Sequence, residues 1–372
     1  MLIVPFVSAS FHRSWVIILL LAPFGRVAGQ ANSYYFYQPR PYGSEALFNP
    51  ISLLANGGFD TYQIINDRQP TLDASYWNSA STNVWRSISS PFDVIRKFGT
   101  TRFLRKEVFP MSLQIDDAQY VPNFVLHTIG GGMVYRKVSE WYDYHGFPAP
   151  YLFGAVTSVG FEFINEAVEN GPNYYPNEDC IPDILLFQPL GILLFSFDGF
   201  SDFFSSQLSL NEWSQPVVAT FHPFAIRNAG QNFVMKYPIN ESRSTSLFFH
   251  FGDFAILGVS VKTNQEDAIS VGAGLASTGR RSLPVVNGVV SNTVTVGGMA
   301  GVYYDRNNSL LASAVYSDVE NNRFRLNIYP GVFTIPDFSP GLFFTVGNHG
   351  TFVAGVTARF LPIGLGFHSS GR

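Results

Sequence analysis

The chain has 372 residues, of which 46% are apolar and only 13% are charged. Soluble domains carry roughly 25% charged residues, so the composition fits neither a charged soluble enzyme nor a disordered chain. The 23 basic and 27 acidic residues give a formal net charge of −4, which leaves no broad positive surface and argues against a nucleic-acid partner. The single cysteine, Cys180, excludes an internal disulfide and a four-thiolate zinc site.

Residues 1–29 have the order of a secretory signal peptide. The pair His12 and Arg13 precedes an apolar run over residues 15–24, and the small residues Ala28 and Gly29 follow. This run is shorter than the roughly 20 residues needed to span a bilayer, so we expect cleavage near Gly29 rather than a retained anchor. After export, the chain is either soluble outside the cytoplasm or held in a membrane as β-structure.

Residues 30–115 form an N-terminal segment in which we expect short helices, beginning at Pro50 and Pro91, and an early strand over residues 58–65. Residues 116–204 have helical periodicity, with predicted helices over 122–141, 150–169 and 182–197. The stretches 150–161 and 184–197 carry no charge. We therefore expect these helices to be buried in protein or partly inserted in lipid, but not to span it.

Residues 205–372 alternate with a period of two. Ile269, Val271 and Leu275 share one face of a predicted strand, as do Phe324 and Leu326 on another. The opposite faces carry mostly small and polar residues, whereas a soluble sandwich would carry charge. Aromatic residues also stand near strand ends, as they do in outer-membrane barrels.

The predicted fold is therefore mainly β: an antiparallel transmembrane β-barrel of about 8–12 strands. A helical insertion of about three helices, over residues 116–204, would plug its lumen or rest at its periplasmic mouth. A secreted β-sandwich is the alternative.

The middle of the chain carries an ordered set of polar and small residues. They are Asp117, Asn123, His127, Gly131, Tyr135, Arg136, Ser158, Glu162, Glu166, Asp183, Pro189 and Gly191, followed by Phe251, Gly252 and Asp253. This order resembles an uncharacterised family of bacterial outer-membrane β-barrel proteins, in which a Tyr is usual in place of Phe251. The match covers residues 117–253, about a third of the chain. The resemblance implies an exported barrel with helices in the outer membrane of a Gram-negative cell, and it implies no particular activity.

The polar residues of this set form stripes on apolar helices. A spacing of three or four places Asn123, His127 and Tyr135 on one helix face. The same rule places Ser158, Glu162, Glu166 and Glu169 on one face of the next helix. Buried carboxylates are costly unless paired, so we expect the stripes to face one another. In the structural interpretation His127 and Arg136 neutralise Glu162 and Glu166, and Asp183 caps its own helix. The expected cluster contains Asn123, His127, Tyr135, Arg136, Glu162, Glu166 and Asp183.

Three other interpretations remain open. Ser158, His127 and a carboxylate, either Glu162 or Asp183, could serve as nucleophile, base and orienting group of a lipid hydrolase, although Ser158 lies on no nucleophile elbow. Glu162, Glu166 and His127 could bind a divalent metal, and the same stripe could line a small-solute path. We favour the structural interpretation over these three: a structural or envelope-associated outer-membrane protein without a cofactor. Its expected partners are the lipid bilayer and lipid or lipopolysaccharide.

Overall fold

The computed structural model describes residues 34–59, 74–110, 119, 121–171, 173–221, 224–227, 230–335, 338–359 and 361–369. These belong to one compact unit that begins at Tyr34. The predicted signal peptide lies outside the described residues, as does most of the strand expected over residues 58–65.

Helices occupy the first half of the described chain, and no described strand precedes Asn211. The three helices expected from sequence correspond to η4 with α6, to α7, and to α8 through α9. The stretch that becomes α3 was not expected. The elements are η2 (Ser44–Leu47), α1 (Pro50–Gly58), α3 (Ala74–Ser89), α4 (Pro91–Phe98), α5 (Thr100–Phe103), η3 (Leu104–Val108), η4 (Phe124–Gly130), α6 (Gly131–Tyr144), α7 (Pro150–Asn170), α8 (Cys180–Pro182), η5 (Asp183–Phe187), α9 (Gln188–Phe195), α10 (Asp198–Asp202) and η6 (Phe203–Gln207).

Local sequence signals explain where several helices begin. The Asn49 side chain accepts hydrogen bonds from the backbone N–H groups of Ile51 and Ser52, at 3.0 and 2.9 Å. The Ser52 hydroxyl in turn accepts one from the backbone N–H of Asn49 at 3.1 Å, which completes a capping box. α4 begins at Pro91 as expected, but the Ser90 side chain makes no capping bond.

Thirteen strands form one sheet in the order β1-β4-β5-β6-β7-β8-β9-β10-β11-β12-β13-β2-β3. All neighbours are antiparallel except β13 and β2, which confirms the mainly antiparallel β class. Among the described residues the edge strands β1 and β3 do not pair with each other. The strands are β1 (Asn211–Glu212), β2 (Val218–Phe221), β3 (Phe224–Arg227), β4 (Phe233–Pro238), β5 (Thr245–Phe251), β6 (Phe254–Lys262), β7 (Asp267–Ser282), β8 (Asn292–Arg306), β9 (Ser309–Ser317), β10 (Phe324–Ile328), β11 (Pro340–Val346), β12 (Phe352–Ala358) and β13 (Gly364–Ser369).

The two faces of the sheet differ in composition: the outward face is apolar, whereas the inward face mixes polar side chains with a buried apolar cluster. Polar side chains point inward, where the Ser270 hydroxyl donates to that of Ser260 at 2.9 Å and Asn327 donates to Ser313 at 3.1 Å. The alternate positions are apolar and exposed to the surroundings. These outward residues are Leu247, Leu257, Val259, Val261, Ile269, Val271, Leu275, Val296, Val302, Tyr316, Phe324, Leu326, Leu342, Phe344, Val356, Leu365 and Phe367.

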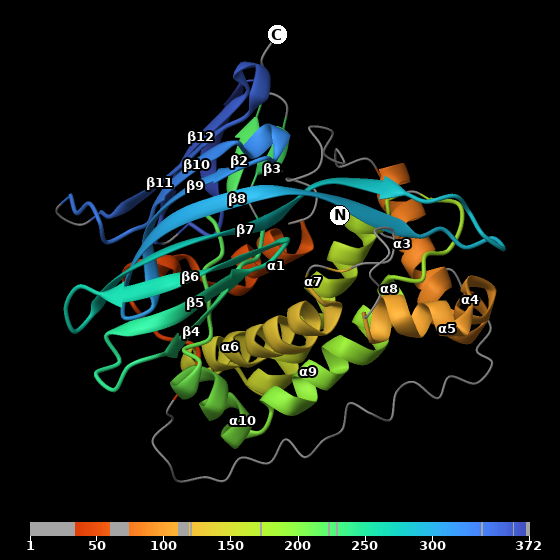
Figure 1. Cartoon of the computed structure of the whole chain (residues 1–372), viewed down its shortest axis with the longest axis horizontal. Helices are drawn as coiled ribbons and strands as arrows, with labels where there is room; N and C mark the ends of the chain where they lie inside the picture. The colour runs from red at the N-terminus through yellow and green to blue at the C-terminus, as the bar shows by residue number, and fades with distance from the viewer. Residues whose placement is uncertain are drawn as a thin grey trace. The chain divides into compact units, whose positions relative to one another are not determined.

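The helices pack on one another and on the first strands through a shared apolar core. Met133 and Val138 of α6 join Phe233 of β4 and Phe251 of β5 in this core. Figure 1 shows α6 and α9 as neighbouring helices, and α6 contacts both α7 and α9.

Close backbone approach explains a glycine between these helices. A Cβ atom on Gly191 of α9 would lie 2.7 Å from the backbone oxygen of Thr128 and 3.0 Å from the backbone nitrogen of Gly132. Glycine is therefore required where α9 meets η4 and α6.

A buried ion pair joins α6 to two distant elements. Lys137 Nζ lies 2.8 Å from Glu45 Oε1 in η2 and 3.5 Å from Glu212 Oε2 in β1.

Among the described residues no single helix is long and apolar enough to cross a membrane. One pair of helical segments, Cys180–Phe195 and Asp198–Gln207, bent by 92°, passes that test by length and composition only.

Candidate functional site

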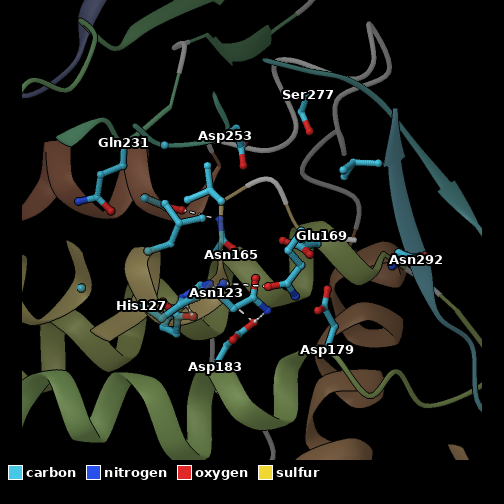
Figure 2. Close-up of a pocket in the computed structure, with 18 of the residues that line it drawn as sticks. Asn123, His127, Asn165, Glu169, Asp179, Asp183, Gln231, Asp253, Ser277 and Asn292 are labelled. Carbon is cyan, nitrogen blue, oxygen red and sulfur yellow. Dashed lines mark hydrogen bonds and ion pairs between the residues drawn. The ribbon is translucent and has the colours of Figure 1, made fainter. Parts of the chain in front are cut away.

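A polar cavity of about 160 Å³ lies between the helices and one end of the sheet. Helical residues from η3, η4, α7 and η5 form one side, while the β5–β6 turn, β7 and β8 contribute the other (Figure 2). Its polar lining residues are Lys106, Glu107, Gln119, Asn123, His127, Glu162, Asn165, Glu169, Asp179, Asp183, Gln231, Asp253, Ser277, Asn292 and Thr293.

His127 occupies the π-helical turn η4, a geometry that is frequent at functional sites. Its Nδ1 lies 2.7 Å from Glu162 Oε1, and its Nε2 lies 3.7 Å from Asp183 Oδ2. Burial alone would lower the pKa of His127, but the carboxylates of Asp183 and Glu162 outweigh it and raise that pKa well above its ordinary value. The imidazole is therefore held between two acidic side chains that favour its protonated form.

Amide side chains extend this network to a third carboxylate. Asn123 Nδ2 donates to Asp183 Oδ2 and to Glu107 Oε2, each at 3.5 Å. Gln119 Nε2 also donates to Glu107 Oε2, at 3.2 Å. Figure 2 shows Asn123, His127 and Asp183 side by side. Burial raises the pKa values of Asp183 and Glu107 well above the ordinary range, although His127 and Lys106 respectively oppose this.

Lys106 supplies the second positive charge of the cavity wall, and its ammonium group contacts three polar side chains. Its Nζ lies 2.7 Å from Glu107 Oε1 and 2.9 Å from Glu178 Oε1, and it donates to the Ser291 hydroxyl at 2.7 Å. Sequence reasoning did not find this pair, because neighbouring Lys and Glu residues on a short helix usually form a solvated surface.

Two buried polar groups of the wall have unused hydrogen-bonding capacity. Asp183 is 2% exposed, yet its Oδ1 atom accepts no hydrogen bond. Gln231 is 6% exposed, and its Nε2 atom donates none. A buried donor or acceptor left without a partner costs about 1–3 kcal/mol. Among the described residues, these two atoms of the cavity wall therefore have no hydrogen-bond partner.

Asp253 lies in the turn between β5 and β6, where the Phe251, Gly252 and Asp253 motif places it against the cavity. Burial raises the pKa of its carboxyl to about 6, although His127 opposes the shift. The carboxyl therefore titrates near neutral pH.

Ser158 is fully buried, and its hydroxyl accepts a hydrogen bond from Gln188 Nε2. Among the described contacts none joins Ser158 to His127, and both nitrogens of that ring face carboxylates. Of the expected set Ser158, His127 and Glu162, only His127 and Glu162 are therefore in contact.

The remaining members of the expected polar cluster lie away from the cavity. Arg136 pairs with Glu140 at 2.9 Å and Asp198 at 2.8 Å, not with the carboxylates of α7. Arg136 is nine positions from His127, which places it on the opposite side of the helix at about 100° per residue. Tyr135 OH lies 3.1 Å from the Ser196 hydroxyl.

Glu166 Oε2 accepts from Asn170 Nδ2 at 3.0 Å on its own helix, and the charge of Glu166 also acts on His127 and Asp183. Among the described residues no three His, Cys, Asp or Glu side chains are placed to hold a metal ion. The trio of Glu162, Glu166 and His127 is therefore not arranged as a ligand set.

The sequence analysis identified Asn123, His127, Glu162, Glu169 and Asp183 but missed the rest of the wall. Gln119, Asn165, Asp179 and Gln231 follow no shared spacing. They meet only through the packing of α7 against the segments that precede η4, α8 and β4, which local periodicity does not encode.

No protein-family model, curated protein or solved structure matches this chain. The site is therefore interpreted from its geometry.

Proposed function

We propose that this chain is an integral envelope protein of the outer-membrane β-barrel type, with a structural role in the membrane. The observation that carries the proposal is the apolar outward face of the sheet. Val259, Val271 and Val302 lie next to one another across β6, β7 and β8, and are 44%, 54% and 48% exposed. In water such a continuous apolar surface is rare, whereas lipid solvates it.

The inward face supports the same interpretation. Arg325 and Asn327 alternate with the exposed Phe324 and Leu326 along β10, and both polar residues are buried. A strand with apolar residues outward and polar residues inward is the pattern of barrels in lipid. A soluble sandwich would reverse it.

The helices carry matching apolar surfaces. Leu152, Val156 and Val159 follow one another on a face of α7, and are 53%, 64% and 37% exposed. The spacing of four and three places them in one stripe. We propose that this stripe contacts lipid or the membrane interface, with lipid or lipopolysaccharide as the partner.

Two alternative functions receive less support. A hydrolase would need Ser158 within reach of a base, and its hydroxyl is instead bonded to Gln188. A solute path would need an open interior, but Trp213, Tyr303 and Tyr329 fill the inside of the sheet and are 0% exposed.

Fractionation of a Gram-negative host that expresses the full chain tests the proposal. We expect the protein in the outer-membrane fraction, and we expect it to migrate faster on a denaturing gel when unheated than when boiled. Recovery as a soluble monomer without detergent would contradict the proposal.

A further inference from the structure

β7 and β8 extend beyond the strands that flank them. β7 pairs with β6 only as far as Ala276, and β8 pairs with β9 only from Met299 onward. Residues 277–298 therefore form a two-stranded hairpin, the β7–β8 arm, which has no flanking strand among the described residues. Figure 1 shows β7 and β8 reaching past their neighbours toward α4. A hairpin without further strands has little stability of its own in water.

The β7–β8 arm forms part of one wall of the polar cavity. Ser277 at its base, and Asn292, Thr293 and Val294 on its returning strand, line the cavity. Figure 2 shows Ser277 and Asn292 on the sheet side, away from His127 on the helices. The side chains of Asn292 and Thr293 are buried, with 8% and 9% exposure. Movement of the arm away from the helices would therefore expose both of them and the cavity behind them.

The base of the arm is attached to the sheet and is followed at once by a bulge. The backbone N–H of Ser277 donates to the backbone oxygen of Asp253 at 3.0 Å, and the backbone oxygen of Gly298 accepts from the N–H of Asp318 at 2.8 Å. The register of β7 against β8 then shifts between Ser277 and Gly279. A β-bulge leaves one residue unpaired and bends the strand that contains it. The bulge is therefore the point about which the arm can turn.

Hydrogen bonds hold the far end of the arm on the helical part of the chain. The backbone N–H of Val290 donates to the backbone oxygen of Pro176 at 3.1 Å. The Ser291 hydroxyl accepts from Lys106 Nζ at 2.7 Å. Water can replace each of these bonds when the arm moves away, so their net contribution to the closed position is modest.

One apolar side chain of the tip adds to these bonds. Val289 is 1% exposed and packs in a small cluster with Val94 and Phe98 of α4. Val285 and Val286 of the same tip are 44% and 43% exposed. Burial of Val289 is therefore the apolar contribution that distinguishes the docked tip from a free one.

We propose that the β7–β8 arm is a lid over the polar cavity. It turns about the bulge after Ser277, releases the contacts of Val289 and Val290, and opens the cavity to small molecules from the surroundings. The structure holds the closed position. The inference goes beyond the envelope role, and it depends neither on the occupant of the cavity nor on the solvent around the sheet.

Thiol labelling of the purified full chain, in a Cys180→Ser background, tests the proposal. Thr293→Cys places a thiol on the arm, and Asn165→Cys places one on α7 in the same cavity; both native residues are buried. When the arm closes faster than the thiol reacts with iodoacetamide, the labelling rate measures the open population. We expect Val289→Ala to speed labelling at both positions roughly tenfold, because truncation of a buried valine weakens the closed position.

Val285→Ala is the matched control, since the same truncation at an exposed valine of the same tip removes no buried contact. It should leave both labelling rates unchanged. Equal rates in Val289→Ala and its parent would overturn the proposal. Faster labelling at position 293 alone would also overturn it, because the arm would then move without controlling access to the cavity.

A distance measurement provides a second test that uses exposed sites only. Spin labels at Val285→Cys on the tip and at Asp93→Cys on α4, again in a Cys180→Ser background, report the separation of the arm from the helices. We expect Val289→Ala to raise the share of a longer distance between the two labels. The same single short distance in Val289→Ala and its parent would contradict the lid.

Discussion

His127 sits between Glu162 and Asp183, and its charge stabilises both. Its raised pKa means that the folded state holds this proton more tightly than the unfolded state does. The resulting stabilisation is present below the ordinary pKa of 6.5 and is lost as the pH rises through the raised folded-state value. Near neutral pH the imidazolium therefore contributes to stability.

His127→Ala should lower the free energy of unfolding by about 3–5 kcal/mol at pH 7, because two buried carboxylates lose their cation. The loss should shrink at lower pH, since burial raises the pKa of Asp183 and its protonation removes the unpaired charge. Denaturant unfolding measures both effects. Glu241→Ala, at an exposed turn residue, is the control and should change stability by less than about 0.5 kcal/mol.

Asp253 provides a test with a defined pH window. Its folded-state pKa is raised from 3.8 to about 6, so the unfolded chain releases this proton first and stability falls as the pH rises between those values. Asp253→Asn should remove a fall of about 3 kcal/mol from the stability profile. Unfolding measured at several pH values from 4 to 7 checks this. An unchanged profile in the variant would contradict the assignment.

Part of the site could be predicted from the spacing of individual residues in the sequence. Four-residue spacing identified Asn123 and His127, and Glu162 on the facing helix. It could not reveal that Arg136 pairs with Asp198, because that partner comes from a different helix. Nor could it reveal Gln231, whose role depends on a contact between a strand end and the helices.

At the scale of elements, proline starts and breaker-rich linkers predicted α6, α7 and α9 close to their observed bounds. Alternation predicted the long strands equally well. α3 was not predicted because its polar composition hides the apolar periodicity of the buried face, which contains Ala80 and Val84. β1 and β3 have only two and four residues, too few for a period to show, which is why the sheet has more strands than expected.

Helix packing can be tested at Gly191. Gly191→Ala should lower the free energy of unfolding by about 1–3 kcal/mol, because the added methyl meets backbone atoms of η4 and α6. Gly199→Ala is the matched control, since a Cβ there meets nothing within 4 Å. It should be neutral or slightly stabilising, as alanine is the better helix former. Equal effects of the two changes would argue against the close approach of α9.

For the whole molecule, the decisive property is the continuous row of exposed apolar residues on the outward face of the sheet. The low share of charged residues, 13%, already indicated a surface with unusually little charge. The sequence pattern could not distinguish inward from outward faces, since alternation has the same period either way. Burial in the folded chain makes that distinction.

A charge on the outward face should prevent assembly in lipid. Val271→Lys places an ammonium in the middle of β7 and should cost about 2–4 kcal/mol if that position lies in the bilayer. Gln265→Lys adds the same charge in the exposed turn before β7 and should be tolerated. The fraction of heat-modifiable protein in membranes measures the difference. Equal assembly of both variants would place the strand outside lipid.

The solvent around the outward residues can be measured directly with a spin label at Leu257→Cys, in a Cys180→Ser background and in reconstituted liposomes. If the sheet faces lipid, the label at position 257 is more accessible to dissolved oxygen than to a water-soluble nickel chelate, and a label at Gln265→Cys shows the reverse. Preferential access of the nickel chelate at position 257 would contradict the central claim.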